Sequence, residues 1–499
     1  MKKLISKTTF LDFQNCPKNT WLKLHKPKLL EKYQLSEFEK HIIEQGNEVE
    51  SYARNLFPGG IEIVSTGEEA CQETTRHMAS KVPVLFQSTF IVDGFIARND
   101  VLEHDEANSC WNLYEVKGSN SVKEEGTSSR DHITDLAFQA NLLKRANISI
   151  GKYFLVHLNK EYVRYGDLDV KKLFTIEDET DKVLARMETI DPQMEAAREY
   201  LNRKEEPKGE CDCVYKGRRN HCTTFKYTNG HIPDYSVHDI SRIHKTKLEL
   251  LIERKIYALE DIPEDFKLSD KQWNQVRAQQ TQRPEVDTEK IKEELESLQF
   301  PLYFFDYEAF GLAIPIFDGF SPYKRIPFQF SLHILREPDG ELEHIEYLHE
   351  DQTDPTENVA ELLKEHIKPG GTVIAWHTSF EMGVNREIGE RLPAFASFFE
   401  QMNGSFYDLK NIFADQHYIH PAFKGSASLK SVLPAIISEV GYADLDISDG
   451  GSAADAWWKM VSPATDPKEA AKIAKDLKTY CGVDTYAMYA IWKHLRDIL

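Results

Sequence analysis

Two acids and a lysine near the N-terminal end of the chain form the first set of residues that could do chemistry. Asp100 ends a strand-like run at 86–104, and Glu115 and Lys117 lie in the next run at 110–118. Side chains two apart on a strand point to the same face, so Glu115 and Lys117 share a face that Asp100 can reach. Two carboxylates suit Mg²⁺ or Mn²⁺, which can activate a bound water, while the lysine can stabilise charge on a phosphate. The alternative is an ordinary acid–lysine pair on a surface strand.

A second set of acids lies in the C-terminal part of the chain. Asp306 and Glu308 alternate on the apolar segment 301–310, where burial of acids is costly unless they are paired or bind a cation. Tyr480 and Asp484 are four apart, which places them on one face of a helix. Glu381 is a further candidate metal ligand. The alternative is a buried acid pair that is satisfied by hydrogen bonds.

Four of the seven cysteines form the third set: Cys16, Cys211, Cys213 and Cys222. An odd number of cysteines in a chain without a recognisable secretion signal argues against a disulfide framework. Four thiolates can hold Zn²⁺. Cysteines buried without a metal are the alternative, although we expect the last three to lie in an exposed loop.

The same loop is basic. Lys216, Arg218 and Arg219 could contact the phosphates of a nucleic acid, and the neighbouring rings of Tyr215 and Phe225 could stack on its bases. A solvated loop without a ligand is the alternative.

The elements that must position these residues alternate between strand and helix. Helical periodicity occurs at 38–56, 131–146, 356–368, 379–391 and 467–499, and residues 236–299 are mostly helical. Strand-like runs are a strand pair at 86–104 and single strands at 110–118, 152–159, 301–310, 328–336, 341–350 and 372–377. The pattern predicts an α/β protein with a nuclease-like domain at 1–230, a mainly helical spacer at 231–295 and a second α/β domain at 296–499.

The run GFIARNDVLEH followed by WNLYEVKG resembles the RecB-like branch of the PD-(D/E)xK nucleases. The resemblance implies a restriction-endonuclease-like domain in which Asp100, Glu115 and Lys117 are catalytic. It also implies a supporting role for Gln139 in DLAFQANLL and a metal-binding role for Glu50, which stands where the family has a histidine.

The opening SKTTFLDFQNCPKNTWLKL resembles the start of iron–sulfur RecB-like nucleases. The resemblance implies a 4Fe–4S cluster on Cys16, Cys211, Cys213 and Cys222. The C-x-C-x8-C spacing departs from the usual pattern, so zinc stays open as the alternative.

The D-x-E strand and the Y-x-x-x-D helix together resemble the DEDD exonucleases of the RNase H-like superfamily. The resemblance implies an RNase H-like domain with two bound metals and a tyrosine that positions water. The middle motif differs, because His377 and Glu381 stand where that family has asparagine and aspartate. Asp408 is a further acid that could share the site.

The charge and hydropathy of the whole chain limit its partners. The net charge of −20 argues against a strong grip on long duplex DNA. We find no apolar run long enough to span a membrane and no signal core, so we expect a cytoplasmic protein without a membrane partner. There is no Walker A motif, so unwinding would require a partner helicase. The order of the parts is also similar to that of a bacterial family of unassigned function.

These features favour a metal-dependent nuclease that cuts DNA, as single strands or at ends, and has a second 3′–5′ exonuclease-like site. RNA is a possible substrate, and the oligomeric state is open. The alternative is a nucleic-acid-binding adaptor in which one or both centres are inactive. An iron–sulfur redox sensor is a third reading, but a sensor has no use for Asp100, Glu115 and Lys117.

Overall fold

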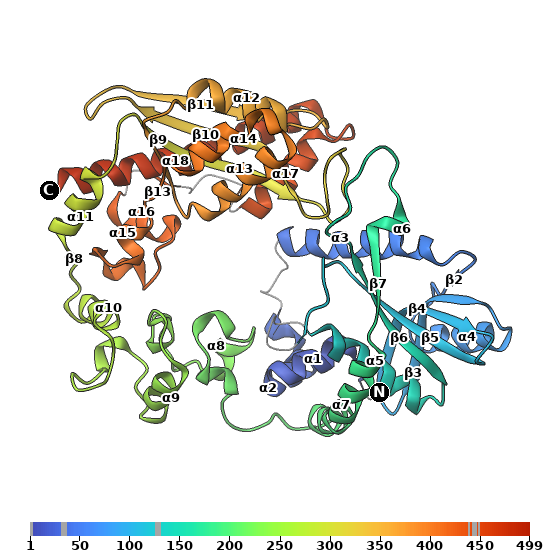
Figure 1. Ribbon diagram of the computed structural model, residues 1–499. Helices are drawn as coiled ribbons and strands as arrows, with labels where there is room; N and C mark the ends of the chain where they lie inside the picture. The colour runs from blue at the N-terminus through green and yellow to red at the C-terminus, as the bar shows by residue number, and fades with distance from the viewer. Residues whose placement is uncertain (1–2, 31–36, 125–130, 438–439, 442–446, 448–449) are drawn as a thin grey trace. The chain divides into compact units, whose positions relative to one another are not determined.

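The structure is a computed structural model that describes residues 3–30, 37–124, 131–437, 440–441, 447 and 450–499 (Figure 1). It is a mixed α/β protein with two compact units. Unit 1 comprises Met1–Val214, Asn220–Gly230 and Leu312–Tyr323. Unit 2 comprises Tyr215–Arg219, His231–Gly311 and Lys324–Leu499.

A seven-stranded sheet forms the centre of unit 1. Its strands are β1 (Ile5–Ser6), β2 (Ile61–Glu62), β3 (Val84–Val92), β4 (Phe95–Asp105), β5 (Cys110–Lys117), β6 (Ile150–Leu158) and β7 (Phe174–Asp178). The order is β2-β3-β4-β5-β6-β7, and β1 pairs with β4. The run at 86–104 is a strand pair as predicted, because Asp93 and Gly94 adopt positive φ angles of 53° and 87° and turn the chain between β3 and β4.

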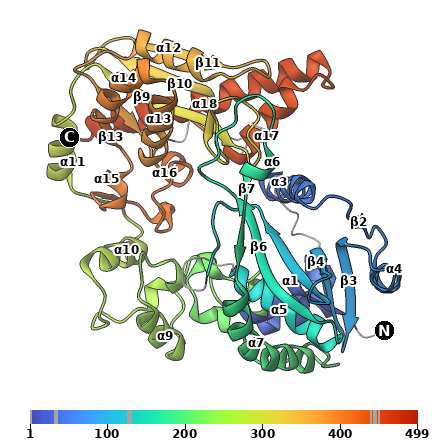
Figure 2. The same cartoon turned by 45° about the vertical axis from the view of Figure 1, so that its right-hand side comes forward.

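Helices cover both faces of this sheet. They are α1 (Lys7–Asn15), α2 (Pro17–His25), α3 (Glu37–Ala53), α4 (Gly67–Ala79), α5 (His132–Arg145), α6 (Val170–Leu173), α7 (Thr180–Leu201) and α8 (Phe225–Thr228). One apolar cluster joins β3 to β6 with α1, α2, α5 and α7, and a second joins the other face with α3 (Figure 2). Helix α5 begins at Asp131, whose carboxylate accepts hydrogen bonds from the amides of Ile133 (2.9 Å) and Thr134 (3.2 Å).

A five-stranded sheet forms the centre of unit 2. Its strands are β9 (Leu302–Gly311), β10 (Arg325–Leu335), β11 (Leu342–Leu348), β12 (Thr372–Ala375) and β13 (Phe406–Asp408). The order is β11-β10-β9-β12-β13. Strand β10 is antiparallel to both neighbours, whereas β9, β12 and β13 are parallel. The short strands β8 (Glu285–Val286) and β14 (Tyr418–Ile419) form a separate antiparallel pair.

The helices of unit 2 are α9 (Lys245–Glu253), α10 (Asp270–Thr281), α11 (Thr288–Glu296), α12 (Thr356–His366), α13 (Ser379–Arg391), α14 (Ala396–Asn403), α15 (Asn411–Ala414), α16 (Leu429–Ile436), α17 (Gly450–Val461) and α18 (Pro467–Asp497). Alternate residues of β9 face opposite layers. Leu302 and Phe304 pack with α18, whereas Tyr303 and Phe305 pack with α12, α13 and α14. Asp306 and Glu308 continue the α18 side of this alternation.

The helices and strands expected from the sequence are found within a few residues of their predicted bounds. The prediction that Asp100 ends its strand is wrong, because Asp100 lies in the middle of β4. Within the described part of the chain, no helix is both long and apolar enough to cross a membrane.

Candidate functional site

The first acidic centre lies where β4 and β5 run side by side in unit 1. The strands are antiparallel, with Val101 opposite Tyr114. One step further along the same register brings Asp100 opposite Glu115. The amide of Val116 donates a hydrogen bond of 2.8 Å to Asp100 Oδ2, which fixes this carboxylate beside β5.

Glu115 is the most enclosed acid of this centre, with 1% of its surface exposed. Gln139 Nε2 on α5 donates to Glu115 Oε2 over 2.6 Å, and Lys117 Nζ donates to Oε1 over 2.9 Å. Lys7 at the start of α1 forms an ion pair with the same oxygen Oε1. Burial alone would raise the pKa of Glu115, but the charges of Lys117 and Lys7 hold it below its usual value. Glu115 is therefore the permanently charged member of the centre.

Asp100 behaves in the opposite way. Burial and the neighbouring charge of Glu115 raise the pKa of Asp100 to about 8. Two adjacent carboxyl groups of which one holds a proton are a poor arrangement unless a cation joins them. The donor set of Asp100 and Glu115 thus fits Mg²⁺ or Mn²⁺, both of which prefer carboxylate oxygens.

Two residues that the sequence did not single out complete the centre. Lys7 is 108 positions from Glu115, and the pairing of β1 with β4 brings the start of α1 to the sheet. Asp135 on α5 forms an ion pair with Lys117, so this lysine bridges two acids. An acid one turn before Gln139 on a helix facing the E-x-K strand is the signal that could have found Asp135.

Glu50, the predicted metal ligand on α3, is engaged elsewhere. Its carboxylate pairs with Arg54 over 2.7 Å and accepts a hydrogen bond from Gln87. Its charge still contributes to the raised pKa of Asp100, so Glu50 lies near the centre. The structure therefore brings Glu50 close to Asp100 without directing its carboxylate only to that group.

An open groove of about 1310 Å³ leads to this centre from the side of α1 and α7. Lys7 and Lys117 lie on its wall together with Arg186. These cations would meet a negatively charged substrate, while Asp131 pairs with Arg186 over 2.6 Å.

The four predicted cysteines converge in unit 1. The Sγ atoms of Cys16, Cys211, Cys213 and Cys222 all lie within 4.8 Å of one another. Cys16 separates α1 from α2, and Cys213 lies in a 3₁₀ turn at Asp212–Tyr215. The expectation of an exposed cysteine loop is wrong, since Cys211 and Cys213 are only 2% and 1% exposed. They are buried against each other and against the helix that carries Cys16.

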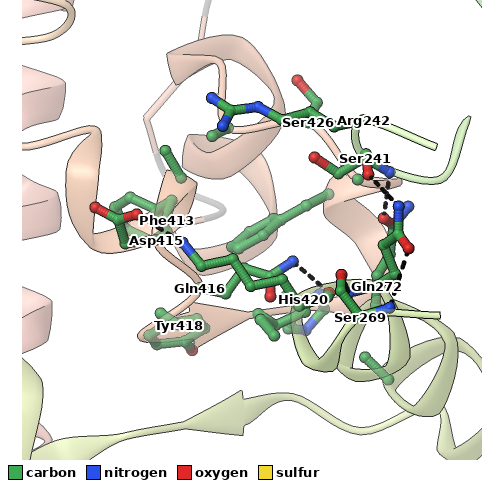
Figure 3. A pocket seen from close by; sticks show the side chains of 18 of the residues that line it. Ser241, Arg242, Ser269, Gln272, Phe413, Asp415, Gln416, Tyr418, His420 and Ser426 are labelled. Atoms are coloured by element: carbon green, nitrogen blue, oxygen red, sulfur yellow. Dashed lines mark hydrogen bonds and ion pairs between the residues drawn. The ribbon is translucent and has the colours of Figure 1, made fainter. Parts of the chain in front are cut away.

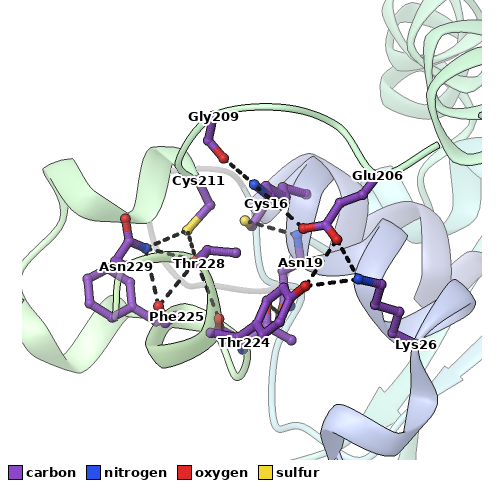
Figure 4. Close-up of polar contacts among 12 residues, drawn as sticks. Cys16, Asn19, Lys26, Glu206, Gly209, Cys211, Thr224, Phe225, Thr228 and Asn229 are labelled. Atoms are coloured by element: carbon purple, nitrogen blue, oxygen red, sulfur yellow. Dashed lines mark hydrogen bonds and ion pairs between the residues drawn. The ribbon is translucent and has the colours of Figure 1, made fainter. Parts of the chain in front are cut away.

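Hydrogen-bond donors surround these sulfur atoms (Figure 4). The amide of Asn19 points at Cys16 Sγ over 3.4 Å, and Asn229 Nδ2 and Thr228 Oγ1 each point at Cys211 Sγ over 3.4 Å. The hydrogen bond with Cys16 lowers the pKa of Cys213 to about 7. Converging sulfurs with N–H and O–H donors aimed at them fit a thiolate-bound metal.

The basic loop beside the cysteines is only partly free. Arg218 forms a bidentate ion pair with Asp239, with contacts of 2.6 and 2.9 Å. Arg219 is exposed and forms no ion pair with a described residue. The structure thus commits Arg218 to holding the chain and leaves Arg219 available.

The second acidic centre lies in unit 2, between β9 and α18. Ligand atoms of Asp306, Glu308 and Cys481 all lie within 4.8 Å of one another. Burial and the charges of Asp484 and Glu308 raise the pKa of Asp306 well above its usual value. The same acids and burial raise the pKa of Tyr480, so α18 brings Tyr480 and Asp484 to β9 as predicted from their spacing. Cys481 was not predicted, although it directly follows Tyr480 in the motif.

Glu381 and Asp408 have different roles near this centre. Glu381, 3% exposed, lies in the first turn of α13, and burial together with the charge of Asp408 raises its pKa to about 8. Its Oε2 is buried and has no hydrogen-bond partner among the described residues. Asp408 instead accepts hydrogen bonds from the amides of His377 (2.9 Å) and Thr378 (3.3 Å), and so holds the start of α13. An orphaned buried oxygen beside clustered acids fits a cation site.

The comparisons with known proteins touch only unit 2. A family described as a domain of unknown function (DUF2779) matches residues 303–428. That range includes Asp306, Glu308 and Glu381 and ends before α18, and it is less than half of the chain. No curated protein matches the chain. The site residues therefore have to be interpreted from their own chemistry.

Proposed function

We propose that the chain is a metal-dependent nuclease whose first centre is built on Asp100, Glu115 and Lys117. The observation that carries the proposal is the enclosed carboxylate of Glu115, which Lys117 and Gln139 orient from β5 and α5 beside Asp100. The RecB-like motif agrees with this arrangement. The substrate we propose is DNA, single-stranded or at an end.

The protein's own groups would divide the work. A cation bound by Asp100 and Glu115 would polarise the phosphodiester and activate water. Lys117 is close enough to Glu115 to stay protonated and would stabilise charge that develops on the phosphate. Gln139 keeps one Glu115 oxygen pointing away from Lys117, and Lys7 faces the groove where a strand would lie.

The second centre supports a 3′–5′ exonuclease-like activity. The antiparallel strands β9, β10 and β11, followed by alternating helices and parallel strands, support an RNase H-like fold. Asp306, Glu308 and Asp484 are its candidate metal ligands, with Glu381 behind them, and Tyr480 is positioned to orient water. The cysteine cluster would hold a 4Fe–4S cluster or Zn²⁺ and join α2 to the segment after α7.

One observation favours a nucleic-acid-binding adaptor instead. Lys7 and Lys117 both pair with the same Glu115 oxygen, so ammonium groups already satisfy a carboxylate that a metal would need. An adaptor would bind nucleic acid but leave it intact.

Cleavage of labelled single-stranded DNA and RNA in Mg²⁺, Mn²⁺ or EDTA tests the proposal. We expect cleavage with either metal, none in EDTA, and a loss of about 100-fold or more in Lys117→Met. Lys152→Met, which removes an exposed lysine at the far end of β6, is the matched control and retains activity. Binding without cleavage in every metal would favour the adaptor.

A further inference from the structure

Unit 2 contains a pocket that belongs to neither acidic centre. It has a volume of about 680 Å³ and lies between two walls, one formed by residues 241–247 and α10, the other by residues 410–427 (Figure 3). Figure 3 shows Arg242 and Ser426 on one side of it and Gln416 and His420 on another.

The charge of this pocket is opposite to that of the chain. Its lining includes five lysine or arginine residues and a single acid, Asp415, in a protein with a net charge of −20. Asp415 pairs with Lys271 over 2.7 Å, so it neutralises only one of the five. Arg219, Arg242 and Lys247 form no ion pair with any residue that the structure describes. Such a concentration of unpaired cations in an acidic protein indicates an anionic ligand.

Hydrogen bonds fix the walls of the pocket. Gln272 Nε2 donates to the carbonyl of Ser241 over 3.0 Å, and Gln416 Nε2 donates to the carbonyl of Lys271 over 2.7 Å. Arg242 and Gln416 both adopt left-handed backbone conformations, with φ of 50° and 65°. Residues with side chains seldom adopt this conformation, and such strain gathers at ligand sites. The pocket is therefore a formed feature and not a gap between loose segments.

The position of the cations indicates the kind of anion. They come from three separate segments, at 219, at 242–247 and at 410, and so suit several successive phosphates better than one. Lys410 Nζ lies 3.4 Å from His377 Nδ1, and His377 is held by Asp408 just before α13. Lys410 thus links the pocket to the segment that carries Glu381 of the second centre.

We propose that this pocket binds the phosphodiester backbone of a single-stranded nucleic acid and leads it toward the second acidic centre. A flexible strand can enter a concave pocket of this size, whereas the remaining acidic surface repels a long duplex. The direction toward the second centre rests on the proposed nuclease function, but the binding of a strand does not.

Fluorescence anisotropy with labelled oligothymidylate and oligouridylate, measured on the full chain in EDTA, tests the pocket separately from cleavage. The variant Arg242→Gln/Lys247→Gln removes two lining cations. Lys245→Gln/Lys267→Gln removes two exposed cations of unit 2 that do not line the pocket, and it is the charge-matched control. Circular dichroism and thermal unfolding check that both variants fold.

We expect the pocket variant to bind about tenfold more weakly at physiological salt, because each lost phosphate contact lowers the salt dependence of log Kd by about 0.7 for single strands. The control keeps wild-type affinity, and the tighter of the two oligonucleotides identifies the sugar. Equal weakening in both variants, or no weakening in either, would overturn the pocket. Competition by inorganic phosphate at the oligonucleotide's own phosphate concentration would overturn a strand as its ligand.

The same variants distinguish this inference from the nuclease proposal. If the wild type cleaves with Mn²⁺ and Arg242→Gln/Lys247→Gln binds and cleaves equally well, the pocket inference fails alone. If the pocket variant loses binding but no protein cleaves in any metal, the nuclease proposal fails alone.

Discussion

Asp100 and Glu381 are carboxyl groups whose pKa values are both raised to about 8. In the unfolded chain such groups titrate near 4. The folded protein therefore holds protons that the unfolded chain has released, so the free energy of unfolding falls as pH rises from about 4 to about 8. Without metal, the two centres destabilise the protein most at the alkaline end of this range.

This argument predicts that Asp100→Asn in EDTA raises the melting temperature at pH 8 by a few degrees and makes the pH dependence shallower. Mg²⁺ should raise the melting temperature of the wild type more than that of the variant, because the variant has lost a ligand. Differential scanning calorimetry across pH measures both effects. Asp105→Asn, at the exposed end of the same strand, is the control. Parallel profiles of Asp100→Asn and the wild type would contradict the burial of Asp100 beside Glu115.

Gln139 offers a test of positioning. Gln139→Leu removes the 2.6 Å hydrogen bond to Glu115, and we expect cleavage by the first centre to fall about 10–100-fold, as for other groups that orient metal ligands. Asn141→Leu changes a second buried amide on α5, one that bonds to the Met187 carbonyl, and should keep the rate per folded molecule. Equal rates in the wild type and Gln139→Leu would remove Gln139 from the centre.

The residues that carry the motifs were predictable, but their partners were not. Glu115 and Lys117 share a face of a strand because of period-two alternation alone. Lys7 reaches Glu115 only through the pairing of β1 with β4, which no local pattern in the sequence indicates. Cys481 meets Asp306 because α18 crosses β9, and its spacing from Tyr480 and Asp484 gave no sign of that.

At the level of elements, turns and periodicity located most of the structure. The Asp93-Gly94 turn separates β3 from β4, and α13 spans Ser379–Arg391 as its periodicity predicts. The position of Asp100 within β4 was missed, because the apolar run gave no boundary at its C-terminal side. The burial of the cysteine segment was also missed, since its bases suggested solvent and only the tertiary structure brings Cys16 to it.

The cysteine cluster joins elements that are far apart in the chain, so its metal should contribute to stability. We expect Cys16→Ser to lose the bound metal and to lower the melting temperature by several degrees. Elemental analysis for iron and zinc, with the visible absorption spectrum of anaerobically purified protein, measures the occupancy. Cys71→Ser, on α4 away from the cluster, should keep the metal. A wild-type protein with neither iron nor zinc and four free thiols would contradict the cluster.

At the level of the whole molecule, two acidic centres lie in separate units of one chain. Each has its own acids, its own supporting helix and its own route for an anion, the groove beside Lys117 and the pocket beside Lys410. The net charge of −20 and the local cations are compatible, because affinity for a strand depends on the contacts in the site.

Cleavage of end-labelled single-stranded DNA in Mn²⁺ by Asp306→Asn, with and without Lys117→Met, tests the central claim most directly. The first variant retains only the first centre, and it should cut the strand at a measurable rate. Adding Lys117→Met should reduce that rate about 100-fold or more. Equal cleavage by the two proteins, or none by Asp306→Asn in any divalent metal, would contradict a nuclease centre at Asp100, Glu115 and Lys117.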